Sequence, residues 1–85
     1  MKKMITVFED KSPSLEEVQG IIGGYVERIV IQDSKDQMYV DEEGLYKDLE
    51  FNIEASNLAN RPIVGHAVIL KGDAIWKWDC VKVFT

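Results

Sequence analysis

The feature that most restricts the fold of this chain is a nearly continuous apolar run, Ile63–Leu70. The run has the length of a β-strand and lacks the polar alternation of a strand with one solvent-facing side. We therefore predict a central strand that is covered on both faces. The chain has only 85 residues, so we expect a single domain, 1–85, with a thin core. Further apolar burial in a homo-oligomer would supplement such a core.

Two short helices are predicted. One covers residues 13–22, with Ser12 or Ser14 as the capping residue and Gly23-Gly24 as the stop signal. The other follows Asn52, which can cap a helix that continues to Ala59.

The remaining sequence is mostly strand-like. Strands are predicted over residues 4–8, 25–32, 37–41 and 63–70, and the tail alternates from Lys77 onward in a way that favours another strand. Residues 45–51 form a connection of ambiguous structure whose Leu45, Leu49 and Phe51 are expected to reach the core. The sum predicts an α+β fold, with a small, mostly antiparallel sheet of four to five strands and the two helices packed against it.

The charge balance and the cysteine count limit the function and the compartment. Lys plus Arg total 10 against 15 Asp plus Glu, a net charge of −5, which argues against general nucleic-acid binding. Cys80 is the single cysteine, so no intramolecular disulfide can form. The apolar stretch before Glu9 is too short for a signal peptide, and no stretch has the length of a membrane span. We expect a cytoplasmic protein without a membrane partner.

The inventory of catalytic groups is small. His66 is the only histidine, and with Cys80 it cannot supply the three or four ligands of a zinc site. The glycines of residues 20–24 end a helix, whereas phosphate-binding glycine loops precede one. We predict no catalytic residue, no metal and no cofactor; the minor enzymatic alternative uses Asp41, Glu43 and His66.

Amphipathic aromatic residues are numerous for so small a domain, and arginine is scarce. We predict that both groups meet a small nucleotide-like ligand, with aromatic rings stacking on a base and arginines meeting phosphate. The predicted ligand-binding residues are Tyr25, Arg28, Tyr39, Arg61, Trp76 and Trp78. The same pattern fits a core, a subunit interface or an open site for Trp76 and Trp78, and surface ion pairs for the arginines.

The acidic residues of the middle of the chain carry an alternative function. A strip of carboxylates would attract a basic partner protein and speed its association. The residues of this strip are Asp41, Glu42, Glu43, Asp48, Glu50 and Glu54. A solvated turn is the simpler interpretation of the same cluster.

Four segments in order resemble a known family. They are residues 23–27 (GGYVE), 40–45 (VDEEGL), 52–55 (NIEA) and 63–70 (IVGHAVIL). Over residues 20–70 the chain resembles the phage and mobile-element domain of unknown function 3846. The resemblance brings no activity, cofactor or catalytic residue. The family often has an acid after the glycine of the last segment, where this chain has His66.

The family context implies a phage, prophage or plasmid origin and action in the cytoplasm of a host bacterium. We therefore expect a non-enzymatic anti-defence protein that sequesters a nucleotide-derived immune signal of the host. The alternative is an acidic inhibitor that binds and blocks a host defence protein.

Overall fold

The computed structural model describes residues 4–76 of the chain. Its four strands form one mixed sheet in the order β1-β4-β3-β2. β1 pairs parallel with β4, whereas the β3–β4 and β2–β3 pairs are antiparallel. The elements along the chain are β1 (Ile5–Phe8), α1 (Leu15–Ile22), β2 (Val26–Val30), β3 (Gln37–Asp41), α2 (Ile53–Ala59) and β4 (Ala67–Leu70), with short 3₁₀ turns at Gly44–Tyr46 and Gly72–Ala74. The predicted α+β fold with a mostly antiparallel sheet and two helices is confirmed.

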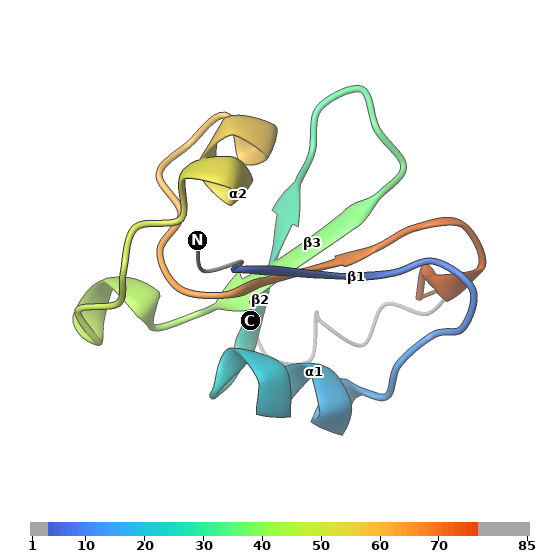
Figure 1. The fold of residues 1–85 in the computed structure, drawn as a ribbon, viewed down its shortest axis with the longest axis horizontal. Helices are drawn as coiled ribbons and strands as arrows, with labels where there is room; N and C mark the ends of the chain where they lie inside the picture. Colours follow the sequence, from blue (N-terminus) through green and yellow to red (C-terminus); the bar gives the residue numbers. More distant parts are fainter. Residues whose placement is uncertain (1–3, 77–85) are drawn as a thin grey trace.

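The two helices cover opposite faces of the sheet (Figure 1). Because side chains alternate along a strand, each central strand contributes to two cores. Val18 and Ile22 of α1 pack with Val26, Tyr39, Val68, Leu70, Ala74 and Trp76. Ala55 of α2 packs with Ile5, Ile29, Met38, Val40, Ile63, Ala67 and Ile69. The result is a thin sandwich of helix, sheet and helix.

β4 occupies the centre of this sandwich, as the apolar run predicted. All four of its residues are buried, and it lies between β1 and β3. The strand begins at Ala67, four residues later than predicted. Gly65 has φ +80°, a left-handed conformation that interrupts an extended strand, and Val64 pairs instead with Phe51 before α2.

Side-chain caps fix where the helices begin. Ser14 is the cap of α1, because its hydroxyl accepts a 3.0 Å hydrogen bond from the Glu17 amide. Helix α1 therefore starts at Leu15, two residues later than predicted, and ends before left-handed Gly23 with φ +97°. Asn52 caps α2 as predicted, with its side chain accepting a hydrogen bond from the Ala55 amide.

The chain after β4 is tied to the edge of the α1 core. The side-chain nitrogen of Gln37 donates to the Trp76 carbonyl at 3.1 Å, and the side-chain oxygen of Gln37 accepts from the Trp76 backbone N–H at 3.0 Å. The Trp76 indole N–H donates to the Pro13 carbonyl at 2.8 Å. The tail strand that was predicted from Lys77 lies outside the described residues.

Candidate functional site

Two of the aromatic residues predicted to bind a ligand belong to the core. Tyr39 is 1% exposed and Trp76 is 4% exposed, and their ring centroids lie 4.7 Å apart. β3 has a strand on each side, and α1 covers the sheet face to which Tyr39 points. The structure thus places these two rings in the core of one chain, which is one of the alternatives that the sequence left open for Trp76.

The other predicted ligand residues that the structure describes lie apart from one another. Tyr25 is 59% exposed and lines a surface hollow with Gln19 and Glu43 beside the end of α1. Arg28 is exposed on the edge strand β2, two residues from Val26 and therefore on the α1 side of the sheet. Arg61 lines a cleft on the α2 side. The two arginines are therefore on opposite faces of the sheet, and Trp78 lies outside the described residues.

The three groups of the enzymatic alternative do not assemble into a metal site. His66 shares a 2.7 Å hydrogen bond with the Thr6 hydroxyl, and partial burial lowers the pKa of its imidazole from the ordinary value of 6.5. Asp41 instead accepts a 2.8 Å hydrogen bond from the Glu43 amide. Within residues 4–76 no three histidine, cysteine or acidic side chains are placed to hold a metal ion.

Asp41 has a structural role that the sequence did not indicate. Its side chain is 2% exposed and accepts a 2.9 Å hydrogen bond from Lys47 in an ion pair. Asp41 therefore does not contribute an exposed charge to the predicted acidic strip, because Lys47 compensates its carboxylate. The other five carboxylates of that strip are exposed.

These five carboxylates share a chain segment with four exposed apolar side chains. Within residues 42–54, which we call the acidic–apolar segment, the exposed fractions are 81% for Leu45, 91% for Tyr46, 52% for Phe51 and 67% for Ile53. The prediction that Leu45 and Phe51 reach the core is therefore wrong. Both are exposed because the segment runs outside the sheet before α2 begins. Its single cation, Lys47, is occupied by Asp41. The segment therefore carries exposed apolar side chains and exposed carboxylates along one stretch of the chain.

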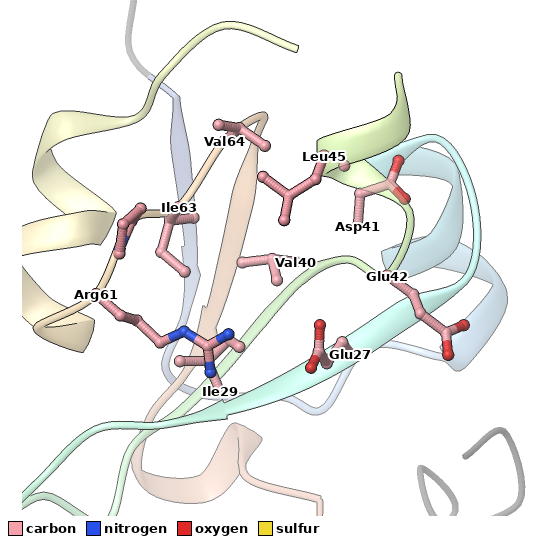
Figure 2. Close-up of a pocket in the computed structure, with 11 residues that line it drawn as sticks. Glu27, Ile29, Val40, Asp41, Glu42, Leu45, Arg61, Ile63 and Val64 are labelled. Carbon is pink, nitrogen blue, oxygen red and sulfur yellow. The ribbon is translucent and has the colours of Figure 1, made fainter. Parts of the chain in front are cut away.

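A small cleft lies beside this segment on the α2 side of the sheet (Figure 2). Its floor consists of Ile29, Val40 and Ile63, which are 2%, 5% and 4% exposed. Leu45, Pro62 and Val64 form its walls, with Glu27, Glu42 and Arg61 among the charged residues that line it. Arg61 reaches in from the side of α2, whereas Glu42 lies at the opposite side (Figure 2).

Of the four charged residues that line the cleft, only Asp41 has an ionic partner within residues 4–76. Among the described residues, Glu27, Glu42 and Arg61 form no ion pair and no side-chain hydrogen bond. The backbone N–H of Arg61 donates to the Ser56 carbonyl at 3.3 Å. This bond holds the Arg61 backbone next to the end of α2. The cleft therefore has a cationic end, an anionic end and an apolar floor.

Comparison with known protein families shows the family of this chain. The family model for a domain of unknown function, DUF3846, matches residues 1–76. The chain belongs to the DUF3846 family. No curated protein and no solved structure matches it.

The DUF3846 match extends beyond the 20–70 stretch indicated by the sequence segments and includes β1 and α1. Both the cleft and the acidic–apolar segment lie inside the matched region. Among the described residues, no helix has the length and apolarity needed to cross a bilayer. The DUF3846 family is described only as a domain of unknown function.

Proposed function

We propose that this DUF3846 protein is a non-enzymatic binding protein that attaches to a basic surface of another protein through its acidic–apolar segment. One observation carries the proposal. Residues 42–54 expose four large apolar side chains and five carboxylates, and the only cation among them is already paired.

Both components of this surface favour a protein partner. Single exposed apolar residues are common, but several within one short segment, surrounded by polar groups, are typical of interaction surfaces. The carboxylates would attract a basic partner over a distance and raise the association rate at low salt. Burial of Tyr46, Leu45 and Phe51 against the partner would then slow dissociation.

The identity of the partner is itself part of the proposal, and we infer a host defence protein from the resemblance stated in the sequence analysis. A host defence protein that handles nucleic acid carries a basic channel, and a strip of carboxylates can cover such a channel in place of phosphates. The protein would then act in the host cytoplasm as an inhibitor that blocks this channel.

Sequestration of a nucleotide signal has less support within one chain. Tyr39 and Trp76 are in the core, and Arg28 and Arg61 lie on opposite sides of the sheet. That function would require a homo-oligomer in which residues of different subunits complete a pocket. Native mass spectrometry of the protein purified from bacterial cells tests it, because a multimer that carries a nucleotide-sized mass would replace our proposal.

A capture experiment with matched variants tests the proposed function. The protein is immobilised and exposed to bacterial lysate, and proteins lost from a double variant, Tyr46→Ser with Glu50→Lys, are identified. The control, Val30→Ser with Glu9→Lys, replaces one exposed apolar side chain by serine and reverses one carboxylate at exposed positions outside the segment. We expect a captured protein that the control retains, the segment variant loses and added salt releases. Equal capture by both variants would contradict the proposal.

A further inference from the structure

The cleft beside the acidic–apolar segment combines apolar and charged lining residues. We propose that this cleft receives one lysine side chain of the partner protein. The inference rests on the proposed function, and it adds the chemical group that the surface recognises.

The size of the cleft fits a single side chain. Its volume is about 70 Å³, well below the roughly 300–1,000 Å³ of pockets that enclose small-molecule ligands. A nucleotide therefore has no room in it. The floor of Ile29, Val40 and Ile63 is apolar but almost fully buried, so the exposed Leu45 and Pro62 beside it offer most of the apolar contact to an aliphatic chain. Lysine joins such a chain to a charged head, and it buries the chain while the head stays at a polar rim.

The charges of the rim select a cation and give it a direction. Glu27 comes from β2, Glu42 follows β3, and neither carboxylate has a cationic partner among the described residues. The adjacent Asp41 is compensated by Lys47 and does not add to the field. Two uncompensated carboxylates against one arginine leave the rim with a net negative charge.

Arg61 determines the orientation of the bound lysine side chain. It enters from the side of α2, away from Glu42 (Figure 2). A lysine ammonium is repelled from the Arg61 end and attracted to the end formed by Glu27 and Glu42. The methylene chain would lie between the two ends, over Ile29 and Val40. Since Arg61 contributes repulsion in this arrangement, its removal distinguishes a cation site from an anion site.

Nuclear magnetic resonance titration of the full chain with Nα-acetyl-lysine methylamide tests the inference. We expect saturable shifts at the methyl groups of Ile29, Val40 and Ile63. Nα-acetyl-norleucine methylamide has a similar chain without the charge, and Nα-acetyl-glutamate methylamide reverses the charge. We expect both to bind about fivefold or more weakly, and equal binding of either one would overturn the proposal.

Charge-neutral variants complete the test. Glu27→Gln combined with Glu42→Gln should weaken lysine binding by about fivefold, whereas Glu54→Gln on α2, outside the cleft, should leave it unchanged. Arg61→Gln should leave binding equal or stronger. Weaker binding by Arg61→Gln would overturn the proposal, because the cleft would then act through its cation. Loss of lysine binding with intact partner capture would refute only the cleft, whereas lysine binding without segment-dependent capture would refute only the proposed function.

Discussion

Asn52 joins three parts of the fold through one buried side chain. The residue is 2% exposed. Its side-chain oxygen accepts from the Ala55 amide at 3.0 Å, and its amide nitrogen donates to the Met4 and Gly65 carbonyls, each at 2.9 Å. The start of α2 is thereby fastened to the residues that precede β1 and β4. We predict that Asn52→Ala is among the most destabilising single substitutions on the α2 side of the sheet.

The magnitude follows from these bonds. Loss of the cap costs about 1 kcal/mol. The Gly65 carbonyl would lose its side-chain donor, which costs about 1–2 kcal/mol, whereas Met4 keeps a second donor in the Ala67 amide, so its loss is smaller. The sum is about 3 kcal/mol. A domain of this length has a total stability of about 4–13 kcal/mol, so the substitution removes a large share.

Urea unfolding followed by circular dichroism measures the effect, and a second variant separates its parts. A loss of about 3 kcal/mol should lower the urea midpoint by about 1–3 M. Asn52→Ser keeps a capping oxygen but lacks the two amide donors, so it should recover about 1 kcal/mol relative to Asn52→Ala. The reasoning would be refuted if Asn52→Ser were as stable as the wild type, or if Asn52→Ala lost less than about 1 kcal/mol.

Three further predictions concern other contacts. Gly65→Ala should cost about 1–3 kcal/mol, because φ is +80° and a leucine methyl lies 2.7 Å from the new Cβ, whereas Gly20→Ala in α1 should cost nothing, since no atom lies within 4 Å of its new Cβ; thermal unfolding compares the two. Lys47→Met leaves the buried Asp41 carboxylate without its cation and should destabilise by about 1–3 kcal/mol, and a variant of wild-type stability would show that the ion pair contributes nothing. Because burial lowers the pKa of His66 below 6.5, the unfolded chain takes up a proton first and stability should fall as the pH drops below that value. His66→Gln should flatten this part of the curve of Tm against pH, and an unchanged slope would assign it to other groups.

Local sequence signals determined the elements because each signal acts over a few residues. The caps at Ser14 and Asn52 bind an amide only three residues away, so they are readable from the sequence. The hairpin of β2 and β3 follows from two strand-like stretches around a polar turn. The apolar run of β4 showed that both faces are covered, since its residues leave no side for solvent.

Tertiary structure decided which side chains are available for function. Tyr39 is buried and Tyr46 is exposed, although both are tyrosines near the same strand, because only the first points to a sheet face that a helix covers. Glu27 and Arg61 are far apart in the chain, and they line the same cleft only because of the order of the strands and the position of α2. Burial and charge pairing depend on what packs opposite a residue, and the local sequence does not contain that information.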